Sequence, residues 1–432
     1  MNNKILHVDL TTQKINVDPI DDSTLYRYLG GRGLGIKLFT EIVPKHIDPL
    51  SGKNILIFST GPITGSSVPT SGRFSLVTKS PLTNTIFHSN SGGFWGPFFK
   101  RCGYDSLIIS GKLKNEDYGY LTIDGGDKVE IKDANNLWGL KSSNLVEKIK
   151  KLEGKSSQVL GIGPAGENLV KISSIMNQAH RAFGRGGVGA VMGSKNLKAI
   201  VVKNGAKRFS VKNKESMKKL NTIAIDKIRV VPTTSQGLAL LGTAALVKVI
   251  NLYGMLPVNN FQTAFTKDSK IDLVSGEKLR RTFVVENEGC YNCIIKCGRM
   301  TDTGEMRGKG PEYESLWALG PLTGIFDLKE IIHANYLCND LGLDTISTGS
   351  TIACAMELQQ KGIIVNSSLN FGTKNSLCDI IEKIALRTGI GNELAEGSLR
   401  FSKKYDAPKY AMQVKGMEIP AYDPRGAFGQ AL

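Results

Sequence analysis

Glycine is concentrated in short clusters in the first half of this sequence, and these clusters limit the possible folds more than any other feature. The 432 residues include 48 glycines, well above the average usage of about 7%. Glycine has no Cβ atom, so it lets backbone N–H groups come close to a neighbouring group. Arg, Ser, Thr and Asn stand in or beside several clusters, and such loops are typical of a surface that binds a large anionic ligand. The clusters are residues 30–35 (GGRGLG), 61–65 (GPITG), 91–96 (SGGFWG), 161–166 (GIGPAG) and 184–189 (GRGGVG).

The glycine clusters do not match the common nucleotide-binding loops. Residues 31–35 (GRGLG) lack the G-x-G-x-x-G spacing, and no G-x-x-x-x-G-K-[ST] sequence occurs. A dinucleotide-binding fold also needs alternating strands and helices, which the first half lacks. The sequence therefore argues against NAD and ATP as ligands.

Strand patterns fill the first half of the chain, and helix patterns fill the second. Short β-rich runs predict strands at residues 5–10, 54–59, 74–79, 106–111, 119–123, 158–161 and 199–203. Helical spacing of apolar residues predicts helices at 237–253, 327–339, 348–361 and 376–388, each followed by a glycine that suits a left-handed cap. Strands followed by helices predict an α+β fold. The polar and basic stretch 204–216 is the expected boundary between a sheet-rich and a helical domain.

Three of the seven cysteines lie within eight residues, at Cys290, Cys293 and Cys297. The C-x2-C-x3-C spacing lacks the second pair or the histidine that a zinc site uses. Three close thiolates with a fourth from elsewhere suit a [4Fe–4S] cluster. The four other cysteines do not follow a ligand pattern, and buried thiols are expected for most of them. They are Cys102, Cys338, Cys354 and Cys378.

The net charge of +16 does not indicate a nucleic-acid partner. Lys and Arg are scattered, and no nucleic-acid-binding module is recognisable. The N-terminus lacks a secretory hydrophobic region, and the longest uncharged apolar stretch, 237–247, is too short to cross a bilayer. We therefore expect a cytoplasmic protein that binds neither nucleic acid nor membrane.

Ordered motifs along essentially the whole chain resemble those of one family. In addition to the glycine clusters and the cysteines, these motifs are residues 71–74 (SGRF), 89–97 (SNSGGFWGP), 162–167 (IGPAGE), 181–195 (RAFGRGGVGAVMGSK), 310–314 (GPEYE), 342–345 (GLDT), 415–418 (KGME) and 423–426 (DPRG). By these motifs the chain resembles the aldehyde ferredoxin oxidoreductases, which are tungsten-pterin enzymes. The resemblance implies a β-rich pterin-binding domain at 1–208, a helical domain with the iron–sulfur cysteines at 209–417, and only the start of a third domain at 418–432.

The resemblance also implies the cofactors and the residues that hold them. The expected cofactors are tungsten (or molybdenum) held by two pyranopterins, Mg²⁺ shared by the pterin phosphates, and a [4Fe–4S] cluster on Cys290, Cys293 and Cys297. The carbonyl groups of Asn90 and Ala182 match the magnesium contacts of the family. Arg73 matches the bridge between cluster and pterin, a role that suits a planar guanidinium. The other implied cofactor-binding residues are Gly92, Gly93, Arg181, Gly184, Asn339, Gly342, Leu343 and Asp344.

The chemistry implied by the resemblance is oxidation of an aldehyde to a carboxylic acid. The electrons pass through the iron–sulfur cluster to ferredoxin, and the protein positions the substrate and moves protons. Glu314 matches the family glutamate near the metal, so a role in proton transfer is expected for it. The resemblance also leads us to expect a homo-oligomer.

Two departures from the family pattern leave alternatives open. Asn339 stands where the family's pterin-binding D-x-x-G-L-D segment begins with Asp, so one charged contact is lost. The sequence also ends at Leu432, before the segment in which the family carries its fourth cluster cysteine. The alternatives are therefore an oxidoreductase completed by a separate C-terminal polypeptide, an inactive paralogue, and an iron–sulfur subunit for electron transfer or complex assembly.

Overall fold

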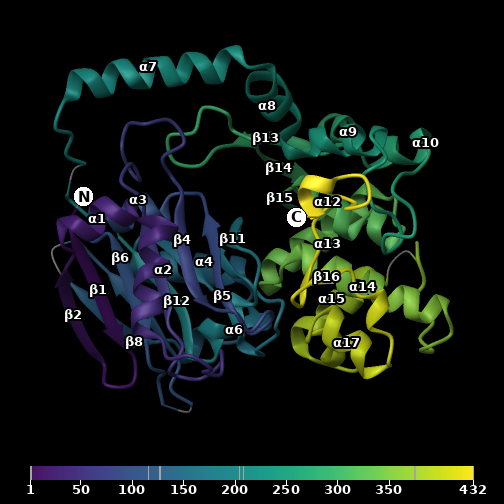
Figure 1. The fold of residues 1–432 in the computed structure, drawn as a ribbon, viewed down its shortest axis with the longest axis horizontal. Helices are drawn as coiled ribbons and strands as arrows, with labels where there is room; N and C mark the ends of the chain where they lie inside the picture. The colour runs from purple at the N-terminus through teal and green to yellow at the C-terminus, as the bar shows by residue number, and fades with distance from the viewer. Residues whose placement is uncertain are drawn as a thin grey trace. The chain divides into compact units, whose positions relative to one another are not determined.

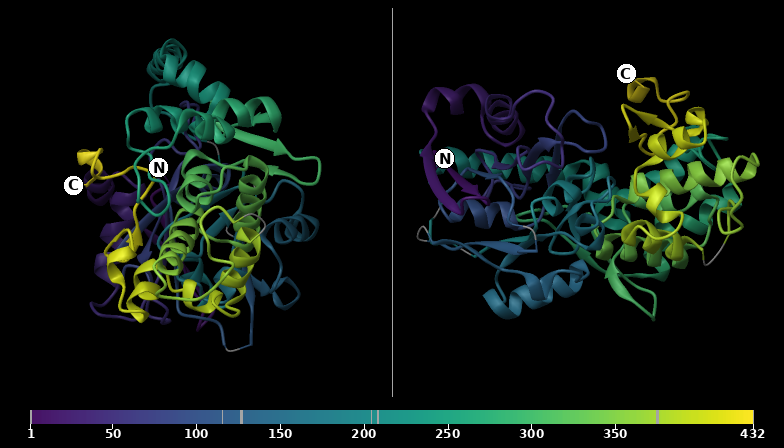
Figure 2. Two further views of the ribbon diagram at one scale, coloured as in Figure 1. Left: turned by 90° about the vertical axis from the view of Figure 1, so that its right-hand side faces the viewer. Right: turned by 90° about the horizontal axis from the view of Figure 1, so that it is seen from below.

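The computed structural model describes residues 2–114, 116–125, 128–203, 205–207, 209–373 and 376–431, and these form two compact units. The first unit contains Met1–Asp226, Cys290–Ile294 and Asp340–Leu343, and the second contains Lys227–Gly289, Ile295–Asn339 and Asp344–Leu432. Figures 1 and 2 follow the chain from its sheet-rich beginning to its helical end. Asn204 and Arg208, which belong to the predicted domain boundary, lie outside the described residues. The boundaries predicted for the domains stay predictions.

The first unit contains two six-stranded sheets. The first sheet has the order β2-β1-β6-β3-β4-β5, with β1 and β6 parallel and the other neighbours antiparallel. Its strands are β1 (Lys4–Asp9), β2 (Lys14–Pro19), β3 (Leu56–Thr60), β4 (Phe74–Lys79), β5 (Ile86–Ser91) and β6 (Ser106–Ser110). The second sheet has the order β11-β10-β9-β12-β7-β8. Its strands are β7 (Gly119–Ile123), β8 (Val129–Asp133), β9 (Gln158–Gly161), β10 (Ile175–Asn177), β11 (Arg181–Phe183) and β12 (Leu197–Val202).

The two sheets pack face to face around one apolar core, and helices cover their outer faces. In β1, the side chains of Leu6 and Val8 enter the core between the sheets, while Ile5 faces the opposite side, as the two-residue period of a strand requires. Helix α2 (Gly31–Ile42) packs on the outer face of the first sheet, and α4 (Ser142–Glu153) packs on that of the second. The other helices of this unit are α1 (Asp22–Tyr28), α3 (Trp95–Arg101), η1 (Asn135–Leu137), α5 (Pro164–Glu167) and α6 (Val188–Gly193).

The seven strands predicted from the sequence are present, with ends that differ by a few residues at most. The strands that the sequence analysis does not predict are β2, β5, β8, β10 and β11, together with the strands of the second unit. Four of these, β2, β5, β8 and β11, are the edges of the two large sheets. Edge strands are short and carry polar side chains, which weakens the apolar pattern by which a strand is recognised.

The second unit is mainly helical. The long helix α7 (Lys214–Val230) belongs to the first unit up to Asp226, and the chain enters the second unit at Lys227. The helices that follow are η2 (Thr233–Gly237), α8 (Leu238–Leu241), η3 (Gly242–Ala245), α9 (Leu246–Leu252), α10 (Asp268–Ile271), η4 (Asp272–Val274), α11 (Gly276–Thr282), α12 (Tyr313–Leu319), η5 (Pro321–Thr323), α13 (Leu328–Leu341), α14 (Thr345–Gln360), α15 (Leu377–Leu386), α16 (Gly391–Leu394), α17 (Ser398–Lys404), η6 (Pro408–Tyr410) and α18 (Phe428–Ala431). A small sheet contains β13 (Val284–Glu288), β14 (Gly298–Asp302) and β15 (Arg307–Lys309), and a hairpin contains β16 (Gln413–Val414) and β17 (Met417–Glu418).

Three of the four predicted helices are present as α13, α14 and α15. The fourth, predicted at 237–253, is broken into η2, α8, η3 and α9, because Gly242 has a φ of 64° and interrupts the regular helix. In length and composition, the stretch Thr233–Leu252 could cross a membrane, and 28% of it is buried. A single stretch of this kind is weak support for a membrane span, since helices in the cores of soluble proteins can have the same composition.

The α+β fold predicted from the sequence is confirmed, with a sheet-rich N-terminal region and a helical C-terminal region (Figure 1). The expectation that most of a third domain is absent from this sequence stays a prediction.

Candidate functional site

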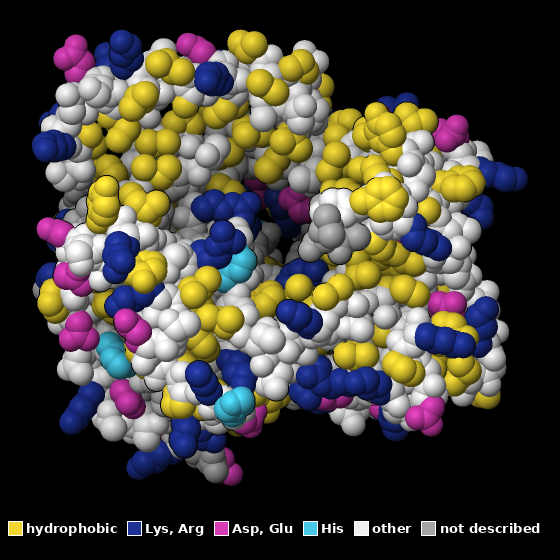
Figure 3. Space-filling model, viewed as in Figure 1, with side chains coloured by type: hydrophobic (Ala, Val, Ile, Leu, Met, Phe, Trp, Pro, Cys, Tyr) yellow, Lys and Arg dark blue, Asp and Glu magenta, His cyan; other side chains and the backbone are white. Residues whose placement is uncertain are grey.

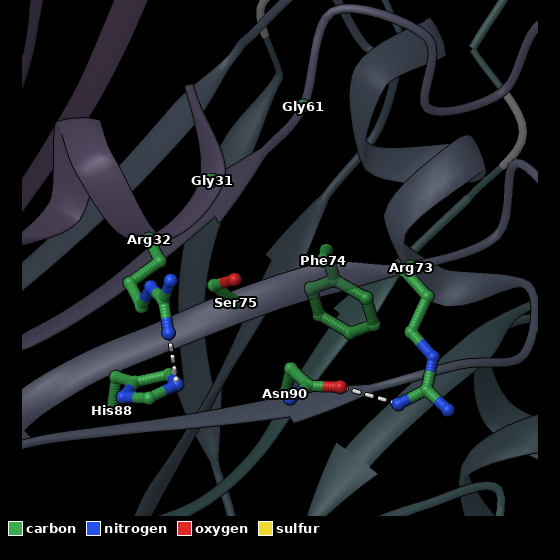
Figure 4. Close-up of a pocket in the computed structure, with 8 residues that line it drawn as sticks. All are labelled: Gly31, Arg32, Gly61, Arg73, Phe74, Ser75, His88 and Asn90. Carbon is green, nitrogen blue, oxygen red and sulfur yellow. Dashed lines mark hydrogen bonds between the residues drawn. The ribbon is translucent and has the colours of Figure 1, made fainter. Parts of the chain in front are cut away.

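A cavity of about 290 Å³ opens in the first unit beside the edge strand β5. Figure 4 shows its lining: the first residues of α2, the strands β4 and β5, and the glycine loop after β3. Four of the motifs recognised in the sequence, residues 30–35, 61–65, 71–74 and 89–97, therefore meet at one place. The lining residues are Gly31, Arg32, Gly61, Arg73, Phe74, Ser75, His88 and Asn90.

The electrostatics of this cavity favour an anion. Helix α2 begins at the cavity and has no acidic residue in its first turn, so its positive N-terminal end is not neutralised there. The guanidinium groups of Arg32 and Arg73 are both solvent-exposed. Burial and the nearby charge of Arg32 lower the pKa of His88, whose Nε2 atom lies 3.3 Å from the Arg32 Nη1 atom. Phosphate groups are the natural ligands of such a site.

Arg73 and Asn90 contact each other at the open side of the cavity. The Nη1 atom of Arg73 donates a hydrogen bond to the Asn90 side-chain oxygen, as Figure 4 shows. This bond leaves the other guanidinium donors of Arg73 available for a ligand.

The edges of the two large sheets adjoin next to this cavity. Strand β5, which carries Asn90, lies beside β11, which carries Arg181 and Ala182. An edge strand has backbone N–H and C=O groups without a neighbouring strand, and these can face a ligand. Gly184 follows β11, and a Cβ atom added to it would meet no atom within 4 Å. The structure therefore brings together Arg73, Asn90, Arg181, Ala182 and Gly184 in the first unit.

The Gly92–Gly93 loop separates this ligand surface from the cysteine segment. A Cβ atom added to Gly92 would lie 2.6 Å from the Cys290 Sγ atom and 4.0 Å from the Arg181 Cδ atom. A Cβ atom on Gly93 would lie 3.2 Å from the Asn177 Nδ2 atom and 3.3 Å from the Arg181 Cδ atom. A side chain at either position would crowd these neighbours, so Cys290 and Arg181 both approach the Gly92–Gly93 loop closely.

The Asn177 side chain holds the Gly92–Gly93 loop in place, and the sequence analysis did not identify this residue. The Asn177 side chain is fully buried, and its Nδ2 atom donates to the Gly92 carbonyl at 2.9 Å and lies 3.2 Å from the Ser91 Oγ atom. Its Oδ1 atom has no hydrogen-bond partner among the described residues. A buried acceptor without a partner destabilises a protein unless a ligand or water satisfies it. No sequence pattern marks Asn177, because its role depends on the loop that lies against it.

Hydrogen bonds fix the first part of the cysteine segment to the first unit. The Asn292 backbone accepts a bond from the Thr70 amide at 2.9 Å, and the Asn292 side chain donates to the carbonyls of Ser67 and Val68. The Tyr291 amide donates to the Gly93 carbonyl at 3.2 Å. These bonds hold Cys290 beside the Gly92–Gly93 loop.

The three clustered cysteines differ from the other four. Cys290, Cys293 and Cys297 are all partly exposed. Cys290 and Cys293 belong to the first unit, and Cys297 belongs to the second. Within the part of the chain that is described, no group of three His, Cys, Asp or Glu side chains is already arranged as a metal site. The donor chemistry fits an iron–sulfur cluster, and their role as ligands stays a prediction.

Burial raises the pKa of each of the remaining cysteine thiols. The pKa is raised to about 12 for Cys102 and to about 11 for Cys378, and it is also raised for Cys338 and Cys354. Thiols that hold their protons so strongly are poor metal ligands. This agrees with the expectation that most of these residues are structural.

The predicted pterin segment is divided between the two units. Gly342 has a φ of 76°, and its carbonyl accepts a bond from the Ser174 amide at 2.8 Å. Leu343 forms a β-bridge with Ser173. These two residues therefore lie against the second large sheet. Asp344 and Asn339 belong to the second unit, where Asp344 caps α14 by accepting a bond from the Ile346 amide at 3.0 Å.

Glu314 lies in the first turn of α12 in the second unit. Its Oε2 atom accepts a bond from the Ala421 amide at 3.0 Å, and the neighbouring Tyr313 hydroxyl donates to the Ala421 carbonyl at 2.7 Å. Burial, and next the charge of Glu314, raise the pKa values of Tyr313 and Tyr422. Both phenols therefore keep their protons near neutral pH.

Comparison with known proteins agrees with this geometry. Residues 5–204 match the N-terminal domain of aldehyde ferredoxin oxidoreductase, and residues 219–432 match domains 2 and 3 of the same family. The chain belongs to the aldehyde ferredoxin oxidoreductase family. The resemblance inferred from the sequence motifs is confirmed.

Characterised members of this family are similar along nearly the whole chain. The tungsten-containing aldehyde ferredoxin oxidoreductase of Pyrococcus furiosus is 46% identical over 99% of this chain and 71% of its own length. The corresponding enzyme of Thermococcus kodakarensis is 44% identical with the same coverage. The WOR-like subunit of an aliphatic sulfonate oxidoreductase from Pyrococcus furiosus is 34% identical. The chain is thus a member of an oxidoreductase family, and the first two of these relatives are named as tungsten-containing enzymes.

A solved structure has the same fold. It is the active site complex BamBC of benzoyl coenzyme A reductase, with a TM-score of 0.85 and 30% sequence identity. The match covers 98% of this chain and 66% of the solved chain, so this chain spans slightly less than two thirds of that relative.

Proposed function

We propose that this chain oxidises aldehydes to carboxylic acids and passes the electrons through a [4Fe–4S] cluster to ferredoxin. The tungsten (or molybdenum) bis-pyranopterin supplies the two-electron redox chemistry when it is bound, and the iron–sulfur cluster supplies one-electron transfer. The family membership and the named tungsten enzymes among the relatives support this proposal.

The observation that carries the proposal is the Gly92–Gly93 loop. The Cys290 Sγ atom and the Arg181 side chain approach this loop so closely that no side chain would fit on Gly92. If Cys290 binds the cluster and Arg181 binds the pterin, the two cofactors are held on either side of this loop. Such short range would suit electron transfer between them.

The residues around the cavity suit the phosphates and the magnesium ion of the cofactor. Arg32, Arg73 and the N-terminal end of α2 bind phosphate oxygens, because they present donors and positive charge without an acidic neighbour in the first turn. The carbonyl groups of Asn90 and Ala182 are proposed as magnesium ligands, since they come from the adjoining edge strands β5 and β11. Gly93, Gly184, Gly342, Leu343, Asp344 and Asn339 are proposed to line the pterins.

Glu314 is proposed to move the proton that leaves during oxidation. Its carboxylate accepts a bond from the Ala421 amide, and the carbonyl of the same residue accepts a bond from the Tyr313 hydroxyl. A fixed carboxylate next to phenols that stay protonated can accept a proton from water or substrate. Ferredoxin and an aldehyde are the proposed partners, and a cytoplasmic location and homo-oligomerisation are proposed with them.

The fourth cluster ligand is proposed not to be one of the remaining cysteines of this sequence. Cys102, Cys338, Cys354 and Cys378 all have raised thiol pKa values because of burial.

The first experiment is metal analysis and electron paramagnetic resonance (EPR) on the anaerobically purified chain, with aldehyde-dependent reduction of a viologen dye. We expect tungsten, iron and aldehyde oxidation together. Iron without tungsten would support an electron-transfer or assembly subunit instead, and the absence of both metals would support an inactive paralogue.

The second experiment is Glu314→Gln. We expect kcat to fall by about 10² to 10⁴, with the metal content and the EPR signal unchanged. Glu312→Gln is the matched control. Glu312 directly precedes α12, and its carboxylate accepts a bond from the Thr243 hydroxyl instead of one from Ala421. An equal loss in both variants would refute a specific role for Glu314.

A further inference from the structure

A basic helix lies close to the cysteine segment on the surface of the first unit. Helix α7 (Lys214–Val230) has no buried residue, and it follows a lysine-rich stretch. Between residues 204 and 226 the sequence has six basic residues (Lys207, Arg208, Lys212, Lys214, Lys218 and Lys219) and two acidic residues (Glu215 and Asp226). Lys214, Lys218 and Lys219 lie on the helix itself, and the other three basic residues precede it.

Two asparagines connect this helix to the cysteine segment through a single residue. The Asn221 Nδ2 atom on α7 donates to the Ser67 Oγ atom at 2.9 Å. The Asn292 Nδ2 atom donates to the Ser67 carbonyl at 2.7 Å, and Asn292 directly precedes Cys293. Both Ser67 and Asn292 are exposed. The surface next to α7 therefore lies close to the cysteine segment.

The lysines differ in where they lie around α7. Lys218 and Lys214 precede Asn221 by three and seven residues, so they share the helix face that contacts Ser67. Lys219 precedes Asn221 by two residues, which places it on the opposite side of the helix. The lysines of one face therefore lie beside the cysteine segment, and their neighbour on the other face does not.

One exposed apolar side chain lies in the loop that leads to Ser67. It is Ile63, whose exposed fraction is 49%. Figure 3 shows hydrophobic side chains gathered over the region of α7, with Lys and Arg side chains at its margin.

We infer that the α7 face carrying Lys214 and Lys218, with Ser67 and Asn292, is the docking surface for a small acidic electron carrier. This inference rests on the proposed function, because it requires a cluster at Cys290 and Cys293. Charge complementarity selects an acidic partner and raises its association rate. The exposed Asn292 brings the carrier next to a cluster ligand, so electrons cross a short protein path. Weak complexes between redox proteins have small interfaces, below about 1,200 Å² in total.

The test measures the binding of an acidic [4Fe–4S] ferredoxin by surface plasmon resonance, with the full chain purified anaerobically. We expect the K214E/K218E variant to lower the association rate about tenfold at low ionic strength, and the difference to shrink as salt screens the charges. K219E is the matched control on the same helix, and it should have less than half the effect of K218E alone. K14E, on the exposed strand β2, should leave the rate unchanged.

Three results would overturn the inference. The first is an association rate that K214E/K218E does not change. The second is an equal effect of K218E, K219E and K14E, which would indicate a response to net charge alone. The third is a fall in molecular mass of K214E/K218E by light scattering, which would assign the face to a second copy of the chain.

The same samples separate this inference from the proposed function. Aldehyde oxidation with a viologen dye and the EPR signal of the cluster report the proposed function, and neither should change in K214E/K218E. Loss of ferredoxin-linked activity with normal dye-linked activity supports the docking surface. If the wild-type chain has no cluster signal, the proposed function fails. If K214E/K218E then also leaves the affinity for ferredoxin unchanged, the docking surface is rejected as well.

Discussion

Two loop glycines of the first unit and three helix-ending glycines of the second unit serve different purposes. In the first unit, Gly92 and Gly163 lie so close to other groups that a Cβ atom would be 2.6 Å from Cys290 Sγ and 2.5 Å from the Leu341 carbonyl group. In the second unit, Gly254, Gly362 and Gly389 end helices with φ values of 65°, 70° and 52°, and a Cβ atom on them would meet nothing within 4 Å. Only the first kind of glycine indicates that backbone must approach something closely.

Two cysteines of the glycine loop region and one cysteine of the helical unit show a similar contrast. Cys290 and Cys293 lie on a turn that is partly exposed next to the Gly92–Gly93 loop, while Cys354 is fully buried in α14 of the helical unit. The side chains are chemically identical, so the surroundings decide whether a thiol can bind metal or only fill space. Predictions that exchange or remove these residues test whether the two regions differ as described.

The largest effect is expected for Cys293→Ala. Removal of a ligand thiolate should abolish the cluster signal in EPR, because cysteine thiolates are the bonds that hold the iron. Cys354→Ala is the matched control, and it should keep the full signal while losing some stability from the core. A cluster signal that survives Cys293→Ala would end the distinction between the two kinds of cysteine.

The next largest effect is expected for Gly163→Ala. The new Cβ atom would clash with the backbone of Leu341, which cannot move like a flexible side chain, so the free energy of unfolding should fall by about 3 kcal/mol. Gly254→Ala should reduce it by about 1 kcal/mol, since only the positive φ is unfavourable there. Urea unfolding of the two variants measures both values. Equal losses would mean that close approach is not what distinguishes the glycines of the first unit.

A smaller effect is expected from the buried lysine of the first unit. Burial lowers the pKa of Lys195 to about 7, and its ammonium donates to the carbonyls of Asn54 and Gly111. The unfolded chain keeps this proton up to a pKa of about 10.4. Between these values the unfolded state binds more protons, so Lys195 makes the unfolding free energy rise with pH by at most about 1.4 kcal/mol per pH unit.

Lys195→Met should remove this contribution, so the slope of stability between pH 7 and pH 10 should be lower than in the wild-type chain, as urea titrations at several pH values would show. Lys53→Met, at an exposed position, should leave the slope unchanged. A slope that is the same in Lys195→Met and the wild-type chain would mean that Lys195 keeps its charge inside the fold.

The smallest effect is expected at the cavity itself. Burial and the Arg32 charge lower the pKa of His88, so Arg32→Gln should raise that pKa toward its ordinary value. An NMR titration of the imidazole measures the change, and Arg27→Gln on α1 serves as a control of equal charge. A His88 pKa that does not respond to Arg32→Gln would leave burial as its only cause.

Much of the fold was predictable because its central strands and long helices carry strong periodic patterns. The buried strands β3, β6 and β12 appear as continuous apolar runs, and α14 is followed by Gly362 at its end. The edge strands were not predictable, because β5 (IFHSNS) has polar side chains at positions that a ligand surface would use. The break at Gly242 was also missed, since glycine alone does not reveal its φ value.

The candidate site was predictable to a similar extent. Family motifs indicated Arg73, Asn90 and Arg181, which the structure places around one pair of adjoining edges. They could not indicate Asn177, whose function depends on a loop more than eighty residues away in the sequence. They also could not show that the predicted pterin segment changes units between Leu343 and Asp344. Long-range packing of this kind is absent from any local pattern.

The adjoining edges of β5 and β11 also affect how the chain behaves before it receives its cofactor. Backbone groups on an edge strand can pair with strands of other molecules, which leads to aggregation. A bound ligand that covers these edges would therefore act as a solubility factor as well as a reaction centre. If the proposed pterin binds here, the chain produced in cells that cannot make it should aggregate more than the chain produced in cells that can.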